Sequence, residues 1–404
     1  MALKAVHVSD VPVSLLDIVQ ENIALALPPA SSTPRSSQGV GDERGENGNE
    51  VAYGVLPAEK FVVMGHRGNG MNMLQSPDRR MKSVKENSLR SFNAVAKFPI
   101  DFVEFDVQVT RDDCPVIFHD NFILTKHKGE IIEKRVTDLT LEEFLTYGPQ
   151  SDHENVGQPL FRKTKDGRIF EWKVEDDAPL CTLQEVFENV DHSVGFNIEL
   201  KFDDHVVYQE ADLTRVLQAI IRVVRDHARD RPIIFSSFQP DAALLIRKLQ
   251  STYPVYFLTN GGNEIFSDVR RNSLDEAIKV CLSGGLQGIV SEVKSVLRNP
   301  GAVTRIKDSH LTLLTYGQLN NVAEVVYMQH LMGVKGVIVD FVREITAAVS
   351  DFISSSAKEA REGEGLLGKS KGDEEAKVAK PQFSQHELSF LFKLIPELIQ
   401  ASGH

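Results

Sequence analysis

Eight short apolar runs recur in the middle of the chain, and stretches with helical periodicity separate them. Several runs are apolar on successive residues, which is typical of parallel strands covered on both faces. The span from Phe61 to about Ile345 fits the roughly 250 residues of a (β/α)₈ TIM barrel. The pattern therefore predicts this α/β fold, with two half-size domains as the alternative. The predicted strands are FVVMGH (61–66), FVEFDVQ (102–108), GFNIEL (195–200), PIIFSS (232–237), PVYFLT (254–259), LQGIVSE (286–292), LTLLTY (311–316) and KGVIVD (335–340).

Two segments interrupt the alternation of strands and helices. VIFHD (116–120) predicts a short additional strand. The segment 148–179 is polar and lacks helical periodicity. Long excursions from compact folds lie on the surface and often carry function. We therefore expect a loop insertion near the barrel mouth, with room for a hairpin.

Polar segments flank the predicted barrel domain, which we place at 61–355. Residues 28–50 combine Pro, Ser, Gly and charge without apolar periodicity, a composition that cannot offset the entropy of ordering. We predict that 1–60 form a partly disordered N-terminal arm, a possible targeting segment. Residues 356–382 resemble a solvated linker. A capping-box spacing and an apolar stripe then predict a C-terminal amphipathic helix over 383–404, which we expect to dock on its own domain.

The charge of the chain limits its partners. A formal net charge of −12 repels nucleic acid and anionic membranes, so we expect no nucleic-acid partner. An anionic small molecule can still bind, because a divalent cation reverses the field around it. No stretch reaches the roughly 18 uncharged apolar residues of a spanning helix, so we predict no transmembrane segment. The three cysteines are far apart and are expected to be reduced thiols.

Three carboxylates follow the predicted strand pattern in a way that favours a metal site. Glu104 and Asp106 are two residues apart, so both face the same side of a strand, and Glu199 ends a later strand. In a barrel, the C-terminal strand ends meet at one face. Adjacent carboxylates repel unless a cation lies between them, and hard oxygen ligands suit Mg²⁺ or Ca²⁺. We predict a divalent metal, Mg²⁺ preferred and Ca²⁺ as the alternative; simple pairing with Arg111 or Lys201 is the competing interpretation.

Two histidines also end apolar runs. His66 and His119 could supply the base and the acid that phosphodiester cleavage needs near neutral pH. Asp120 could orient His119, although an aspartate after a strand is also a common turn residue. Our working assignment makes His66 the base and His119 the acid.

Further polar residues complete the predicted site. Arg67 and Lys201 add positive charge beside the carboxylates, and a guanidinium can hold two phosphate oxygens. Asn87 stands at the start of a helix, where contact with a ligand and simple capping are both open. Tyr316 ends a predicted strand. We include Asn87 and Tyr316 as substrate-binding candidates.

Taken together, these motifs resemble those of the glycerophosphodiester phosphodiesterase family. The resemblance covers roughly Phe61 to Ile345, and the order of the motifs agrees throughout. The motifs that carry it are HRG (66–68), EN (86–87), EFDVQVTRDDCPVIFHD (104–120), ELK (199–201), SSF (236–238) and GVIVD (336–340).

The resemblance implies a (β/α)₈ hydrolase that converts a glycerophosphodiester into sn-glycerol 3-phosphate and an alcohol. It implies that the glycerol 2-hydroxyl is the nucleophile and that water then opens a cyclic phosphate. The roles it implies are acid and base for His66 and His119, metal ligands for Glu104, Asp106 and Glu199, and phosphate contacts for Arg67 and Lys201. Two positions differ from many members of the family: these have Thr where Ser88 stands, and a Trp near the position of Tyr316. Both differences concern the fit of the substrate.

The resemblance is closest to plant members associated with plastids, which implies a chloroplast location, with the cytoplasm as the alternative. A lysophospholipase D-type phosphodiesterase and a non-catalytic barrel that only binds ligand are the competing functions. The former would need an exposed apolar surface near the mouth, and the latter would not need both histidines. The head group, the oligomeric state and removal of the N-terminal arm as a transit peptide are left open.

Overall fold

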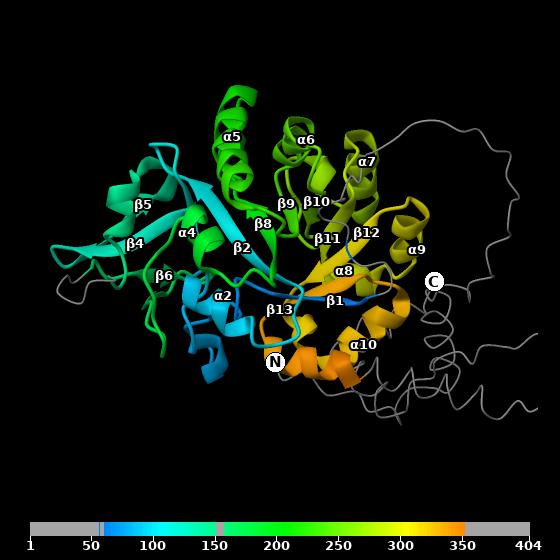
Figure 1. Cartoon of the computed structure of the whole chain (residues 1–404), viewed down its shortest axis with the longest axis horizontal. Coiled ribbons are helices and arrows are strands. Elements are labelled where there is room, and N and C mark those ends of the chain that lie inside the picture. Colours follow the sequence, from blue (N-terminus) through cyan, green and yellow to red (C-terminus); the bar gives the residue numbers. More distant parts are fainter. Residues whose placement is uncertain (1–55, 57–59, 151–156, 352–404) are drawn as a thin grey trace, which may run out of the picture.

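The computed structural model describes residues 56, 60–150 and 157–351 of the 404-residue chain. Eight parallel strands form a closed barrel, because the first strand pairs both with the last and with the second. Figure 1 shows helices outside these strands. All eight predicted strands are present, so the prediction of a (β/α)₈ barrel is confirmed. They are β1 (Val62–Gly65), β2 (Phe102–Val109), β8 (Gly195–Leu200), β9 (Ile233–Ser237), β10 (Val255–Thr259), β11 (Gly288–Glu292), β12 (Thr312–Tyr316) and β13 (Gly336–Val339).

The helices between the strands cover the outer face of the barrel. Many begin at a side-chain cap, such as Thr182, whose hydroxyl accepts from the Glu185 backbone N–H while the Glu185 side chain accepts from the Thr182 backbone. The helices are α2 (Leu89–Val95), α4 (Leu183–Asn189), α5 (Glu210–His227), α6 (Pro240–Leu249), α7 (Leu274–Gly284), α8 (Val293–Arg298), α9 (Gly301–Asp308) and α10 (Ala323–Met332).

Alternation along each strand divides the apolar side chains between two cores. Phe105 and Val107 of β2 belong to the large core between strands and helices. Val62, Met64 and Phe102 belong to a smaller core inside the barrel. Because successive side chains point to opposite faces, Glu104 and Asp106 lie on the inner side of β2. β2 thus contributes apolar side chains to both cores and also carries two of the predicted metal ligands.

The insertion is larger than the sequence pattern indicated. It contains a four-stranded antiparallel sheet in the order β5-β4-β6-β7, with a short helix, α3 (Leu141–Leu145). The predicted hairpin within 148–179 is present as β6 and β7, and the predicted extra strand is β3. A further hairpin of β4 and β5 precedes them and was not predicted. The strands are β3 (Pro115–Ile117), β4 (Phe122–His127), β5 (Glu130–Arg135), β6 (Phe161–Lys163) and β7 (Ile169–Glu171).

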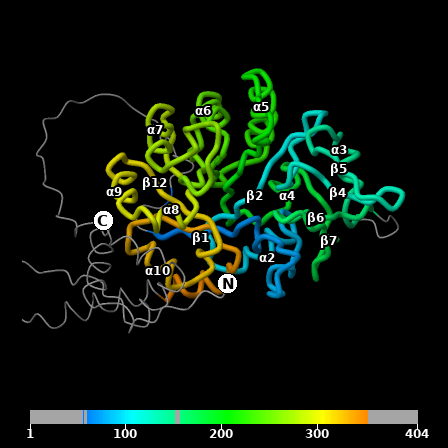
Figure 2. The backbone as a smooth tube through the Cα atoms, turned by 180° about the vertical axis from the view of Figure 1, so that it is seen from behind, coloured from blue at the N-terminus to red at the C-terminus, as the bar shows by residue number. Residues whose placement is uncertain are grey.

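The insertion has its own apolar core and lies to one side of the barrel. Phe118, Phe144 and Trp172 are buried together in it. Figures 1 and 2 show the insertion, in cyan and green, beside α2 and α4 and away from α7 and α9. The β4–β5 hairpin turns at Lys128 and Gly129, both with positive φ (49° and 94°), as its tight turn requires. It follows directly on His119 and Asp120, so the insertion begins at the candidate site.

The predicted linker and C-terminal helix lie outside the described residues, as does the N-terminal arm apart from Leu56 and Lys60. The division of the chain into these segments therefore stays a prediction. Within the described part of the chain, no helix is both long enough and apolar enough to cross a membrane.

Candidate active site

A cavity of about 500 Å³ opens at the C-terminal ends of the barrel strands. Two predicted site residues, Asn87 and Asp106, do not line it but are buried beside it, where the Asn87 amide donates to Asp106 Oδ2 at 2.8 Å. The structure thus brings together residues from β1, β2, β8 and β12 that are far apart in the sequence. The predicted site residues that line the cavity are His66, Arg67, Glu104, His119, Glu199, Lys201 and Tyr316.

Strand register gathers the three predicted metal ligands. Asp106 of β2 pairs with Glu199 of β8, and Glu104 lies two residues earlier on the same face. One oxygen atom from each of the three carboxylates lies within 4.8 Å of the other two. All three side chains are buried.

The electrostatics of the three carboxylates fit a bound cation. Burial raises the pKa of Glu104 to about 8, and the negative charge of Asp106 adds to this shift. Glu104 Oε1 and Asp106 Oδ1 are buried without a hydrogen-bond partner. Buried carboxylate oxygens rarely remain unsatisfied, so these atoms fit the coordination of a divalent cation such as Mg²⁺ or Ca²⁺.

The competing interpretation, simple pairing with basic neighbours, explains only part of this arrangement. Lys201 Nζ lies 2.8 Å from Glu199 Oε1 and 3.5 Å from Asp106 Oδ1. Arg111 pairs with Glu143 instead, at 3.8 Å. Glu104 receives the backbone N–H of Arg67 at 2.9 Å on its other oxygen, Oε2. Basic partners therefore leave the trio incompletely satisfied.

His66 is held by the last strand of the barrel. Its Nδ1 lies 2.7 Å from Asp340 Oδ1, just beyond β13. Its Nε2 lies 4.0 Å from Glu104 Oε2. Burial disfavours the imidazolium, but Asp340 outweighs this effect, so the pKa of His66 lies above its ordinary value. The sequence pattern places Asp340 at a strand end but does not indicate its pairing with His66.

His119 has a matching carboxylate partner. Its Nδ1 lies 2.7 Å from Asp120 Oδ1, so Asp120 contacts the ring as well as following the strand. Burial lowers the pKa of His119, and the positive charges of Arg67 and Lys201 lower it further. Each histidine therefore has Nδ1 fixed by a carboxylate, which leaves Nε2 for proton transfer.

The turn after β1 positions Arg67. Arg67 adopts a left-handed conformation with φ 49°, and Gly68 and Gly70 follow with φ 89° and 99°. A Cβ on Gly68 would lie 2.4 Å from Ser91 Oγ, so only glycine fits. The Arg67 guanidinium is buried against Glu86, with Nη1 to Oε1 at 2.7 Å.

The two remaining candidates differ in position, because Tyr316 lines the cavity and Asn87 is buried beside it. Asn87, with φ 54°, binds Asp106, while Ser88 provides the N-cap of α2. The capping interpretation therefore applies to Ser88 and not to Asn87. Tyr316 donates its hydroxyl to Asn260, and its ring packs edge-on against Phe238 with centroids 5.9 Å apart.

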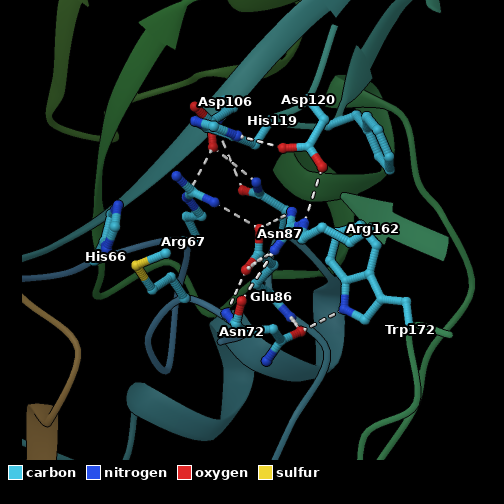
Figure 3. A network of polar contacts seen from close by, with 12 residues as sticks. His66, Arg67, Asn72, Glu86, Asn87, Asp106, His119, Asp120, Arg162 and Trp172 are labelled. Atoms are coloured by element: carbon cyan, nitrogen blue, oxygen red, sulfur yellow. Dashed lines mark hydrogen bonds and ion pairs between the residues drawn. The ribbon is translucent and has the colours of Figure 1, made fainter. Parts of the chain in front are cut away.

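Three functional-site neighbours were not identified from the sequence. Glu86 occurs there only within the motif EN (86–87), Asp340 only at the end of a predicted strand, and Arg162 not at all. Figure 3 shows Glu86 and Arg162 within one network that includes Arg67, His119 and Asp120. The motif EN (86–87) marks Glu86 but not its partners, whereas Arg162 lies in a polar segment without a distinguishing pattern.

The sequence of the chain is similar to those of known proteins of one family. Residues 66–344 match the glycerophosphoryl diester phosphodiesterase family. The chain is 56% identical to the chloroplastic glycerophosphodiester phosphodiesterase GDPD1 of Arabidopsis thaliana, over 99% of this chain and all of that protein. It is 58% identical to GDPD3 of the same species, over 94% of this chain and 99% of the relative.

A solved structure shows the same fold. The putative glycerophosphoryl diester phosphodiesterase from Silicibacter pomeroyi superposes with a TM-score of 0.55 at 21% identity, over 75% of this chain and 97% of that one. The family match spans the barrel from the end of its first strand to the helical residues that begin at Val342, after its last strand, and it includes the insertion. The chain therefore belongs to the glycerophosphoryl diester phosphodiesterase family.

Proposed function

We propose that the protein hydrolyses glycerophosphodiesters, such as glycerophosphocholine and glycerophosphoethanolamine, to sn-glycerol 3-phosphate and an alcohol. The observation that carries the proposal is the meeting of three buried carboxylates and two carboxylate-bound histidines at one cavity. A barrel that only binds ligand would need neither the unsatisfied carboxylate oxygens nor both histidines.

We propose that Glu104, Asp106 and Glu199 hold a divalent metal, Mg²⁺ in preference to Ca²⁺. When bound, the metal would polarise the phosphoryl group and offset its negative charge. Arg67 and Lys201 line the same cavity and would contact the phosphate, although both are also paired with carboxylates. Asn87 would hold Asp106 in place, and Tyr316, which lines the cavity, would contact the substrate.

The two histidines would move the protons. His66 would take the proton of the glycerol 2-hydroxyl as that oxygen bonds to phosphorus, and His119 would protonate the departing alcohol oxygen as its bond to phosphorus breaks. Water would then open the cyclic phosphate with the roles reversed. Asp340 and Asp120 support this proposal, because each holds Nδ1 of one ring and leaves its Nε2 available.

Product analysis on glycerophosphocholine tests this function. With Mg²⁺ we expect equal amounts of sn-glycerol 3-phosphate and choline, and no turnover after exhaustive treatment with EDTA. Glycerol together with phosphocholine would contradict the proposed bond cleavage. Faster hydrolysis of lysophosphatidylcholine under the same conditions would favour the lysophospholipase D-type activity instead.

We also propose a chloroplast location, with residues 1–60 as the targeting segment. The similarity to a chloroplastic relative of Arabidopsis thaliana over nearly the full chain supports this proposal. Import of a reporter fused to residues 1–60 into isolated chloroplasts tests it. A fusion that remains outside the organelle would favour the cytoplasm.

A further inference from the structure

Arg162 brings the insertion into contact with the candidate active site. It lies on β6, and its side chain is only 11% exposed. Its Nε donates to Asp120 Oδ2 at 2.9 Å. Its Nη2 donates to Glu86 Oε1 at 2.7 Å, and its Nη1 to Glu86 Oε2 at 3.0 Å and to the Asn72 carbonyl at 3.1 Å. Every nitrogen of the guanidinium is therefore used.

The two carboxylates bound by Arg162 each hold a candidate catalytic or phosphate-binding residue. Asp120 contacts His119 through its other oxygen, Oδ1. Glu86 Oε1 also accepts from Arg67 Nη1 at 2.7 Å. In Figure 3, Arg162 lies between Asp120 and Glu86, with His119 and Arg67 beyond them. One guanidinium thus connects the supports of two site residues.

We propose that Arg162 is a positioning residue for the hydrolysis reaction, and that through it the insertion forms part of the active site. The inference rests on the proposed function. Arg162 would act through Asp120 to fix the ring of His119, and through Glu86 to fix Arg67. It would not touch the substrate itself.

Burial explains why these contacts need arginine. Burial opposes ionisation of Glu86, but Arg162 and Arg67 outweigh it and hold its pKa at about 2. A planar guanidinium can bind Glu86 through two nitrogens while a third reaches Asp120. A lysine ammonium is a single point of charge on a flexible stem, so it can compensate charge without fixing both carboxylates.

The guanidinium of Arg162 also stacks on the ring of Trp172. Arg162 Cζ lies 3.6 Å from the centroid of the Trp172 ring, and the indole N–H donates to Asn72 Oδ1 at 3.0 Å. Trp172 is the one tryptophan in the sequence. Urea unfolding followed through its fluorescence therefore reports whether the insertion is still folded when Arg162 is replaced.

The test compares Arg162→Gln and Arg162→Lys with Lys163→Gln as the matched control. Lys163 is the next residue on β6, so its side chain points to the opposite face, where it pairs with Glu133 at 3.6 Å. On glycerophosphocholine we expect Arg162→Gln to lower kcat by roughly 10- to 100-fold, the effect typical of an outer supporting partner. KM should change by less than about threefold, and Lys163→Gln should match the wild type.

A double-variant experiment tests whether Arg162 acts through Asp120. Residues that act as one unit have non-additive effects, so Asp120→Asn combined with Arg162→Gln should be little slower than the slower single variant. Multiplied effects in the double variant would overturn the inference. So would a wild-type kcat in Arg162→Gln.

Arg162→Lys keeps the test decisive if the glutamine variant loses its fold, as judged by urea unfolding followed through Trp172 fluorescence. A folded lysine variant with a wild-type kcat would overturn the positioning role, whereas a lower kcat at nearly unchanged KM would support it. Failure of the proposed function is distinguishable: in that case the wild-type protein itself would not release choline from glycerophosphocholine.

Discussion

Asp340 lies 2.7 Å from His66 Nδ1, so the last strand of the barrel fixes a histidine at the end of the first. The two residues are 274 positions apart. Asp340 also accepts the backbone N–H of Met71 and the side-chain amide of Asn321, both at 2.9 Å. Its carboxylate therefore cannot rotate freely, and the imidazole is held in one orientation.

Replacing Asp340 by Asn should lower kcat on glycerophosphocholine by roughly 10- to 100-fold, because the amide keeps the shape but loses the charge that orients His66. Steady-state kinetics on the folded variant measure the effect. Asp308→Asn, at the exposed end of α9, is the control and should not alter the rate. An unchanged kcat in Asp340→Asn would show that the contact is not needed.

Replacing Asp106 by Asn should weaken divalent-metal binding, because the trio loses a charge while its shape is kept. Titration calorimetry with Mg²⁺ and Ca²⁺ after treatment with EDTA measures this independently of activity. Asp308→Asn should bind as the wild type does. Equal affinity in Asp106→Asn and the wild type, in a folded variant, would contradict the assignment of Asp106 as a ligand.

Two glycines, Gly68 in the turn after β1 and Gly129 in the β4–β5 hairpin, allow a matched test of how crowding affects the free energy of unfolding. Gly68 and Gly129 both have positive φ, so alanine costs on the order of 1 to 3 kcal/mol of backbone strain at either position. Only at Gly68 would the new Cβ meet other atoms, whereas at Gly129 it meets nothing within 4 Å. Overpacking should add roughly 1 to 3 kcal/mol at Gly68.

Urea unfolding of Gly68→Ala and Gly129→Ala measures this difference in the free energy of unfolding. Equal losses at the two positions would mean that the turn can shift away from Ser91.

Because Lys85 is buried, we expect the free energy of unfolding to depend on pH. Its side chain is 2% exposed, and Nζ lies 4.0 Å from the centre of the Trp172 ring and 3.8 Å from Asp177 Oδ1, without a hydrogen bond. Burial lowers its pKa to about 8. The unfolded chain therefore binds more protons than the folded one between about pH 8 and its ordinary pKa of 10.5, so this group favours folding more as pH rises.

Relative to the wild type, Lys85→Met should accordingly be stabilised most at pH 7, and this advantage should shrink by up to about 3 kcal/mol toward pH 10. Urea unfolding at both pH values measures it, with Lys97→Met at an exposed position as the control. A difference that does not change with pH would contradict burial of a charged lysine.

The sequence predicted the parts of the fold that repeat. The eight barrel strands were identified because burial on both faces makes them apolar on successive residues, as in Ile233, Ile234 and Phe235. The β4–β5 hairpin was missed because it is only partly buried, so that EIIEKR (130–135) is mostly polar.

The sequence predicts which site residues lie together when a single strand carries them. It does not predict contacts between residues that come from different elements. Glu104 and Asp106 share a face of β2 by simple alternation. The contacts of Asp340 with His66 and of Arg162 with Asp120 depend on barrel closure and on how the insertion docks. Those arrangements are set by tertiary packing, which leaves no local pattern in the sequence.

Proton transfer by the two histidines is tested by the rate of glycerophosphocholine hydrolysis in His66→Ala, His119→Ala and the double variant. Each single variant should be slower by roughly 10² to 10⁴ while substrate still binds. Because the two rings would act as one unit, the double variant should be little slower than the slower single variant. Near wild-type rates in both folded single variants would contradict acid and base catalysis at this site.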